Sequence, residues 1–445
     1  MKVITIKQFF NLTGELCSSE AIFQGVSVDS RNLKPGDIYF ALPGERVDGH
    51  QFIGLAASKG AVAAVVSYDY SGEGFGLPLI KREDVLKTLQ DLASKILEER
   101  GSRVVAVTGS HGKTTTKEFL TTLIKEKYTA SSTLGNYNGQ IGLPLSILKS
   151  DGAEEILVLE MGMSQAGEIA KLVQIAPPEV AVIGNVDRAH AEFFDSIESI
   201  SNAKAEILSS SKTRLGILNR DLTFYEQVES KGECRKCSFS TSNRDADFLL
   251  SYEKGISSIL HKGNTVFTGR VPVPGVFNLE NFLAAAIAAN AMGVSWEEIG
   301  RASKKLNLPE RRFQELQKGE ILFIDDAYNA SSPLAMRAAL SSIPAPTHQG
   351  RKLALLGEML ELGKFSEDAH REVGEYALDK VELLFCYGEG CKSIVDLWKA
   401  KGRDAQLFLK QDELVEALHE ILIPGDVVLV KGSRGCALEK VIEKF

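Results

Sequence analysis

A glycine-containing turn with a lysine and several threonines is the clearest candidate for chemistry in this chain. The turn consists of Thr108, Gly109, Ser110, His111, Gly112, Lys113, Thr114 and Thr115. The apolar segment 104–107 predicts a buried strand before it, and residues 117–124 after it have helical spacing. In such a turn, backbone N–H groups and the positive end of the helix face bound phosphates. Lys113 would reach the outer phosphates of a triphosphate, and the Thr114 hydroxyl would ligate Mg²⁺.

A carboxylate at the end of a second strand points to the same chemistry. Residues 155–162 predict a buried strand with Glu160 at its end. Ligands of open α/β sheets bind at the carboxyl ends of strands, so we expect Glu160 to share Mg²⁺ with Thr114. The alternatives are a solvated glutamate and an ordinary β–α turn that contains Gly-Lys-Thr. The turn is also shorter than the full Walker pattern, because Val107 stands where that pattern has glycine.

Three further polar residues of this region are candidates for the same site. His190 follows a predicted strand over 180–186, again at a carboxyl end. Lys204 lies in a helical segment over 197–208, where composition alone predicts a surface lysine. Asn136 belongs to a segment rich in glycine and asparagine, which predicts a loop. A long alanine-rich helix follows Gly275, with Asn278 as its expected N-cap and Asn281 in its first turn.

The elements that would position these residues indicate an α/β protein with three domains. A chain of 445 residues is too long for a single core. We expect a small α/β domain over 1–83, a central domain over 84–312 that opens with an amphipathic helix, and a third domain over 313–445. The third contains strands over 321–324, 353–359, 383–388 and 427–432. Because helical patterns separate these strands, they predict a parallel, doubly wound sheet similar to a Rossmann fold.

Composition narrows the class of protein. Apolar residues make up 44% and charged residues 25% of the chain, as in a soluble globular enzyme. The net charge of −8 argues against nucleic acid as a partner. No signal peptide or membrane-spanning segment is expected, and Cys234 and Cys237 lack a second pair at zinc spacing. These features predict a cytoplasmic enzyme, and we expect a monomer.

Taken together, the motifs resemble the Mur ligases, the ATP-dependent amide-forming enzymes of peptidoglycan precursor synthesis. The resemblance covers all three predicted domains in order. It is carried by Asp29-Ser30-Arg31, Asp48-Gly49-His50, the turn over 108–114, Gly135-Asn136, Glu160, His190, Lys204 and Asn281. In the third domain, residues 325–330, 356–363 and 430–435 resemble the members that add D-alanyl-D-alanine to UDP-N-acetylmuramoyl-tripeptide.

The resemblance implies a mechanism and a set of roles. ATP would phosphorylate the tripeptide carboxylate, and the amine of D-alanyl-D-alanine would attack the acyl phosphate. Lys113 would bind the transferred phosphate, Thr114 and Glu160 one Mg²⁺, and His190 with a carbamylated Lys204 a second. Adenosine would contact Asn281, Arg312, Asp326 and Tyr328. The dipeptide would contact Asn329, Lys431 and Ser433. The first domain would hold the UDP end of the precursor, with Ser30 and Arg31 nearby. Substrate would also contact Asp48, Gly49, His50 and Asn136.

Two departures from the family pattern and several alternatives remain. Arg311-Arg312 stands where the family often has Gly-Arg, and Ser332-Pro333 where it often has Asn-Pro. The nearest alternatives are the diaminopimelate- or lysine-adding Mur ligase and folylpolyglutamate synthase. A P-loop NTPase that acts as a switch or kinase is an alternative from another class, as is a catalytically inactive scaffold.

Overall fold

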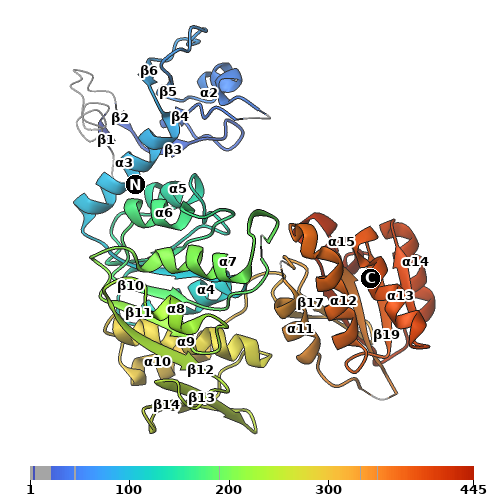
Figure 1. Ribbon diagram of the computed structural model, residues 1–445. Coiled ribbons are helices and arrows are strands. Elements are labelled where there is room, and N and C mark those ends of the chain that lie inside the picture. The colour runs from blue at the N-terminus through green and yellow to red at the C-terminus, as the bar shows by residue number, and fades with distance from the viewer. Residues whose placement is uncertain (1–3, 6–21, 45–46, 190, 331, 348) are drawn as a thin grey trace.

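The computed structural model describes residues 4–5, 22–44, 47–189, 191–330, 332–347 and 349–445. Besides a short pair, β1 (Ile4–Thr5) with β2 (Ile22–Phe23), its strands form sheets of four, nine and six strands. Each sheet with its helices makes one unit, and the units follow one another along the chain. The first unit stands at one end of the central unit and the third lies at its side (Figure 1).

The first unit has a parallel sheet in the order β3-β4-β5-β6. Its elements are β3 (Gly25–Ser27), β4 (Asp37–Phe40), α2 (Ile53–Ser58), β5 (Ala63–Ser67) and β6 (Leu79–Arg82). The expected amphipathic helix is α3 (Val85–Arg100), which Asp84 caps by accepting the Lys87 N–H. Its apolar face packs on α5 (Gly142–Lys149) and α6 (Glu168–Ile175), and therefore joins the first unit to the central one.

The central unit has a sheet in the order β15-β14-β13-β12-β11-β10-β7-β9-β8. Its strands are β7 (Arg103–Thr108), β8 (Ala130–Ser132), β9 (Ile156–Glu160), β10 (Val180–Ile183), β11 (Leu215–Asn219), β12 (Arg235–Ser240), β13 (Phe248–Glu253), β14 (Ile256–His261) and β15 (Asn264–Gly269). Neighbours from β8 to β13 are parallel, and β14 and β15 add an antiparallel edge. The carboxyl ends of β7, β9 and β10 therefore lie side by side, as the expected ligand site requires.

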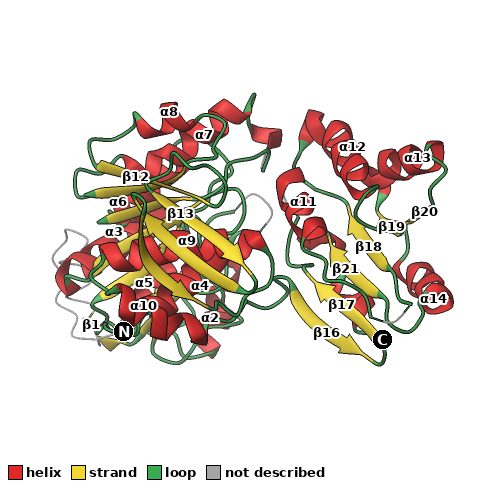
Figure 2. Ribbon diagram, turned by 90° about the horizontal axis from the view of Figure 1, so that it is seen from below, coloured by secondary structure: helices red, strands yellow, loops and turns green. Residues whose placement is uncertain are grey.

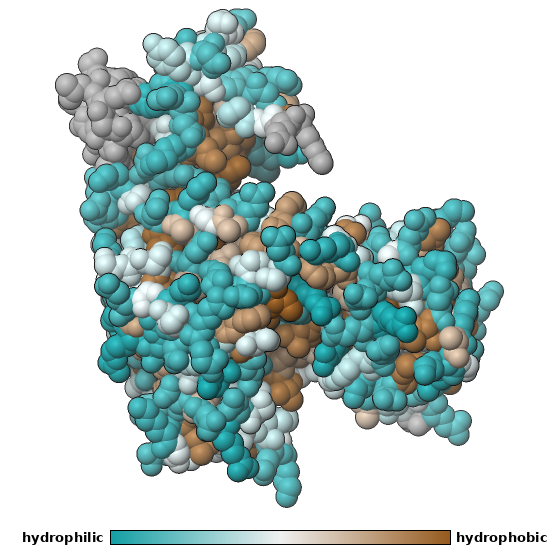
Figure 3. Space-filling model, viewed as in Figure 1, coloured by the Kyte–Doolittle hydropathy of each residue, from teal (hydrophilic) through white to brown (hydrophobic). Residues whose placement is uncertain are grey.

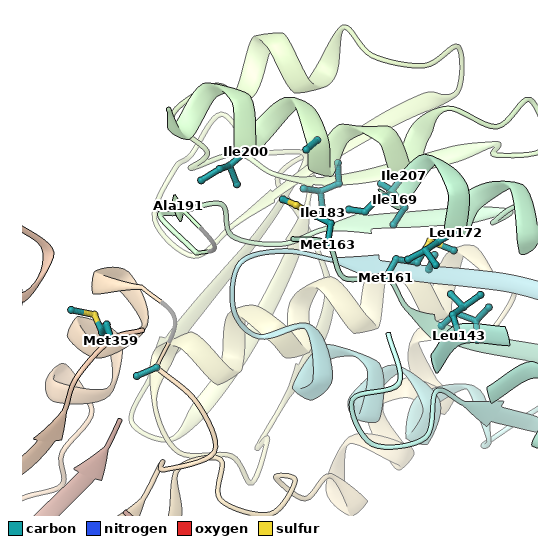
Figure 4. Close-up of a cluster of buried hydrophobic side chains, with 14 of the residues drawn as sticks. Leu143, Met161, Met163, Ile169, Leu172, Ile183, Ala191, Ile200, Ile207 and Met359 are labelled. Atoms are coloured by element: carbon teal, nitrogen blue, oxygen red, sulfur yellow. The ribbon is translucent and has the colours of Figure 1, made fainter. Parts of the chain in front are cut away.

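Helices cover both faces of this sheet (Figure 2). One face carries α4 (Lys113–Ile124), α9 (Val276–Ala291) and α10 (Trp296–Ala302). The other carries α5, α6, α7 (Ile197–Ala205) and α8 (Tyr225–Glu229). On that side Met161, Ile169 and Leu172 lie in a buried cluster that extends to Met359 of the third unit (Figure 4).

The expected start of the alanine-rich helix is wrong. Helix α9 begins three residues earlier, with Gly275 as its N-cap at φ +82°. Glycine adopts this left-handed conformation at little cost, so the chain enters the helix at Gly275. Asn278 is consequently inside the helix, where its Nδ2 donates to the Pro274 carbonyl (2.8 Å), and Asn281 lies in the second turn.

The third unit has a sheet in the order β16-β17-β21-β18-β19-β20. Its strands are β16 (Gln314–Lys318), β17 (Ile321–Asp325), β18 (Lys352–Gly357), β19 (Leu383–Tyr387), β20 (Ala405–Phe408) and β21 (Val427–Lys431). The four expected strands are confirmed and parallel, and β16 is an antiparallel edge that was not expected. One face carries α11 (Pro333–Ser341), α12 (Ser366–Ala377) and α13 (Lys392–Ala400), and the other α14 (Gln411–Ile421) and α15 (Glu439–Ile442). Across the described parts of the chain, no helix combines the length and apolar character needed to cross a membrane.

Candidate active site

The glycine-containing turn lies between β7 and α4, and α9 packs directly against it. Gly112 has φ +78°, and a Cβ at this position would lie 2.3 Å from Asn281 Oδ1. Only glycine fits here for two reasons. The left-handed backbone conformation is strained for other residues, and a Cβ would collide with the Asn281 amide of α9. Thr116 Oγ1 donates to the same Oδ1 (3.2 Å) and fixes Asn281 beside the turn. Helix α4 begins at Lys113, so the turn leads straight into its N-terminus.

Two nitrogen-bearing side chains lie inside this turn. Lys113 Nζ donates to the carbonyls of Gly109 (2.7 Å) and Ser110 (3.2 Å), and burial lowers the pKa of its ammonium. Burial also lowers the pKa of His111 to about 4, so its imidazole is neutral near pH 7. Among the described residues, His111 Nε2 is buried and has no hydrogen-bond partner. An unpaired buried nitrogen next to a lysine at a helix N-terminus fits an anionic ligand such as a phosphate.

An oxygen-rich pair joins the first turn of α4 to the end of β9. Thr114 Oγ1 donates to Glu160 Oε2 (2.9 Å), and Asn138 Nδ2 donates to Glu160 Oε1 (2.7 Å). Glu160 is 1% exposed, so its carboxylate is held in one orientation. Arg312 Nη2 also donates to Thr114 Oγ1 (3.2 Å). A hydroxyl and a carboxylate oxygen suit Mg²⁺, which takes few protein ligands and completes its shell with water and phosphate.

Asn138 was not among the expected site residues. Its signal was present in the glycine- and asparagine-rich segment that also contains Asn136, but spacing in a loop does not predict which amide reaches a strand end. His190, the expected ligand of a second metal ion, lies outside the described residues.

Lys204 is buried beneath the turn, so the surface position that composition alone predicts is wrong. The residue is 2% exposed, and its Nζ donates to the Gly109 carbonyl (3.1 Å). Lys204 belongs to the buried residues of α7, and this hydrogen bond places its amine beside the turn. Burial, with a smaller contribution from Lys113, holds the pKa of Lys204 well below its ordinary value.

The third unit contributes a second group of charged side chains. Lys431 Nζ pairs with Asp326 Oδ2 (2.7 Å) and donates to the Asn329 carbonyl (3.1 Å). The Arg312 guanidinium stacks on the Tyr328 ring, 4.2 Å from its centroid. These residues lie at the carboxyl ends of β17 and β21 or in the segment that joins the two units.

Both groups line one cavity of about 360 Å³. Its expected members are Ser110, His111, Gly112, Lys113, Thr114, Thr115, Asn136, Glu160, Lys204, Asn281, Arg312, Asp326, Tyr328, Asn329 and Lys431. Its unexpected members are Asn138, Gly139, Gln140, Gly162, Met163, Ser164, Glu168, Phe277, Asn278, Ala335 and Ala338. A phosphate-binding turn, an oxygen pair and a lysine from another unit therefore face a common space. Such a space suits a reaction between a nucleotide and a second anionic substrate.

Among the described residues, the other expected site residues do not line this cavity. Thr108 and Gly109 form the base of the turn, and Ser433 donates to the Ala330 carbonyl (2.7 Å) while accepting from the Leu360 N–H (2.9 Å). A hollow separates the first unit from the third, and apolar side chains are visible on its walls (Figure 3).

The expected residues of the first unit form local contacts of their own. Arg31 pairs with Asp29 (2.9 Å) and is largely exposed, and Ser30 beside it is buried. Asp48 Oδ1 lies 2.6 Å from His50 Nδ1, and His50 Nε2 accepts the Ser67 N–H (3.0 Å). Gly49 lies between them. These contacts hold the Asp48–His50 turn in place.

Comparison with known proteins gives matches along most of the chain. Three family models match in order: "Mur ligase family, catalytic domain" at residues 22–96, "Mur ligase middle domain" at 107–289 and "Mur ligase, glutamate ligase domain" at 311–434. The UDP-N-acetylmuramoyl-tripeptide--D-alanyl-D-alanine ligase of Bacillus subtilis is 33% identical over 95% of this chain and 93% of its own. The ligase of the same name from Treponema pallidum is 34% identical, and the match covers 94% of this chain and 93% of that ligase.

Solved structures agree with these matches. A crystal structure of MurF from Acinetobacter baumannii has a TM-score of 0.88 at 25% identity and covers 100% of this chain and 99% of its own. The MurF ligase from Thermotoga maritima in complex with ADP has a TM-score of 0.80 at 32% identity. The match covers 95% of this chain and 97% of that ligase.

Proposed function

The chain belongs to the Mur ligase family, and we infer that it is the ATP-dependent ligase that joins D-alanyl-D-alanine to UDP-N-acetylmuramoyl-tripeptide. The products are UDP-N-acetylmuramoyl-pentapeptide, ADP and phosphate, and the reaction belongs to peptidoglycan synthesis. One observation carries the inference: the phosphate-binding turn of the central unit and Lys431 of the third unit line the same cavity in a chain whose relatives carry this name over nearly their full length.

The reaction follows from what amide synthesis requires. A carboxylate is a poor electrophile, because an oxide ion is a poor leaving group. Transfer of the γ-phosphoryl group of ATP to the tripeptide carboxylate forms an acyl phosphate and releases ADP. The free amine of D-alanyl-D-alanine then attacks the carbonyl carbon, loses a proton and expels phosphate. Water must be excluded meanwhile, because it would hydrolyse the acyl phosphate.

We propose that the turn and the oxygen pair handle the phosphates. The turn amides and Lys113 would bind and orient them, with His111 Nε2 as a further donor. Thr114 and Glu160 would hold one Mg²⁺, which supplies positive charge to offset the phosphate oxygens when bound. Asn138 keeps the Glu160 carboxylate in position for this role. Asn281, Arg312, Asp326 and Tyr328 would frame the adenosine.

For Lys204 we propose a carbamate. Burial lowers the pKa of the Lys204 amine and so favours its neutral form, the form that combines with CO₂ to give a carbamate and a proton. The carbamate oxygens, with His190, would hold a second Mg²⁺, since hard cations prefer oxygen ligands.

We assign the remaining substrates by unit. Asn329, Lys431 and Ser433 would bind D-alanyl-D-alanine, with Lys431 shared between Asp326 and the dipeptide carboxylate. Ser30, Arg31, Asp48, Gly49, His50 and Asn136 would bind the UDP precursor. Residues 1–83 would thus serve the precursor, residues 84–312 ATP, and residues 313–445 the dipeptide.

Product mass tests the assignment. The protein is incubated with ATP and either UDP-N-acetylmuramoyl-tripeptide with D-alanyl-D-alanine, or UDP-N-acetylmuramoyl-dipeptide with diaminopimelate or lysine. We expect the pentapeptide from the first mixture and no product from the second. A tripeptide product from the second mixture would make the protein the neighbouring ligase of the family.

A further inference from the structure

The connection that follows β10 is bonded to the phosphate-binding turn. Ser110 N donates to the Asn185 carbonyl (2.6 Å). Ser110 Oγ donates to the Asp187 carbonyl (3.0 Å) and accepts the Asp187 N–H (2.9 Å). All the atoms of Asn185 and Asp187 in these bonds belong to the backbone. The hydrogen bonds that join the turn to the connection therefore do not depend on the side chain of Asp187.

The same connection contacts the third unit through its side chains. Asp187 Oδ2 accepts the Leu334 N–H (2.9 Å) in the first turn of α11. The next residue, Arg188, pairs with Glu372 on α12 (3.2 Å), and Glu372 also pairs with Arg337 on α11 (2.9 Å). Two consecutive side chains of the central unit thus contact the two neighbouring helices of the third unit.

The contact with α11 has a clear chemical basis. The first N–H groups of a helix have no partner within the helix, and a negative charge there is favourable. Ser332 caps the Ala335 N–H from within the third unit (3.4 Å), and Asp187 supplies the cap of Leu334 from the central unit. Ala335 and Ala338 of α11 line the cavity with the phosphate-binding turn. The Asp187 carboxylate therefore holds one wall of the cavity against the turn.

We propose that Asp187 is a positioning residue that docks the third unit onto the phosphate-binding turn and thereby sets the apparent affinity for the amine substrate. The proposal rests on the proposed ligase function. It separates two effects: the backbone of residue 187 supports the turn and ATP, and its carboxylate supports the position of α11 and hence the amine site.

Steady-state kinetics with varied D-alanyl-D-alanine test this separation in the full chain. Asp187→Ala removes the acceptor, Asp187→Asn keeps an acceptor oxygen, and Asp195→Ala is the matched control, an exposed aspartate further along the same connection. We expect Asp187→Ala to raise the KM for D-alanyl-D-alanine at least about tenfold, the range for a lost charged hydrogen bond. The dissociation constant of a non-hydrolysable ATP analogue should stay within about twofold, because the backbone bonds remain. Asp187→Asn should recover most of the loss, and Asp195→Ala should match the unsubstituted protein.

Hydrogen–deuterium exchange at the Leu334 amide is a readout independent of catalysis. Exchange should be faster in Asp187→Ala than in Asp187→Asn or Asp195→Ala. Glu372→Gln weakens the contact with Arg188 and should also raise the KM for D-alanyl-D-alanine. This variant tests the proposal if Asp187→Ala folds poorly. An unchanged KM and unchanged exchange in Asp187→Ala would overturn the proposal, as would an equal loss of ATP-analogue affinity. Failure of the unsubstituted protein to form the pentapeptide would overturn the ligase function instead, while exchange at Leu334 would still report on the contact.

Discussion

Lys113 is the cation of the phosphate-binding turn, and its Nζ donates to two carbonyls of the turn itself. We predict that Lys113→Ala lowers the rate of ligation at least about hundredfold, as expected when charge stabilisation at a transferred phosphoryl group is lost. The control is Lys125→Ala, an exposed lysine after the end of the same helix. Pentapeptide formation is measured for both variants at saturating ATP. A Lys113→Ala enzyme within about tenfold of the unsubstituted rate would contradict the role given to the turn.

Lys204 is predicted to act as its carbamate. Lys204→Ala should be almost inactive, and a short carboxylic acid in the buffer should restore part of the rate by supplying an oxygen ligand. The same acid should not restore activity to Lys113→Ala, because that variant lacks a cation rather than an oxygen ligand. Protein mass under CO₂ gives a direct measurement, and an unmodified lysine in a fully active enzyme would rule the carbamate out.

Glu280 makes the stability of the fold depend on pH. Its Oε1 accepts from the amides of Asn185 (3.0 Å) and Asn219, and burial raises its pKa to about 7. Because the folded state disfavours the charged carboxylate, the unfolded chain loses this proton first, and stability falls as pH rises from about 4.5 to 7. Glu280→Gln keeps the accepting oxygen and removes the charge. Its free energy of unfolding should exceed that of the unsubstituted protein by up to about 3 kcal/mol at pH 8, and the difference should vanish near pH 5. Thermal unfolding at both pH values measures it. A difference that is the same at every pH would refute this explanation.

At the scale of elements, the close packing of the turn against α9 determines the position of the turn backbone in the site. Gly112→Ala would place a Cβ against Asn281 Oδ1 in a left-handed conformation that costs roughly 1–2 kcal/mol for other residues. We predict a loss of ATP-analogue affinity of at least about tenfold, because the turn amides must move. Gly184→Ala, at the end of neighbouring β10, meets only the Thr108 carbonyl at 3.6 Å and should bind normally. Calorimetric titration measures both, and equal affinities would show that the turn tolerates the displacement.

At the scale of the whole molecule, the cavity draws its walls from two units, so the amine substrate should control turnover. We predict that phosphate release from ATP with UDP-N-acetylmuramoyl-tripeptide alone is at least about tenfold slower than with D-alanyl-D-alanine added, because water is kept from the acyl phosphate. A coupled phosphate assay measures both rates. Equal rates would indicate an NTPase in which the third unit has no part in the reaction.

Local patterns in the sequence determined most of the elements and the chemistry of the turn. Four strands of the third unit were predictable because each is a short apolar run between helical patterns. The phosphate-binding turn was predictable because its strand, glycines and lysine follow one another in the sequence. Residues within one loop or at one strand end, such as Lys113 and Glu160, could therefore be predicted from the sequence, and both line the cavity.

What only the tertiary structure decided are contacts between distant parts of the chain. The order of strands in each sheet and the antiparallel edge β16 depend on non-local pairing. Lys204 reads as a surface lysine until the packing of α7 places it beneath the turn. The amide of Asn138 and the carboxylate of Asp187 find partners 22 and 147 residues away. Residue types carry a capacity for such bonds, but the partner depends on how sheets and helices pack, and no local spacing encodes that arrangement.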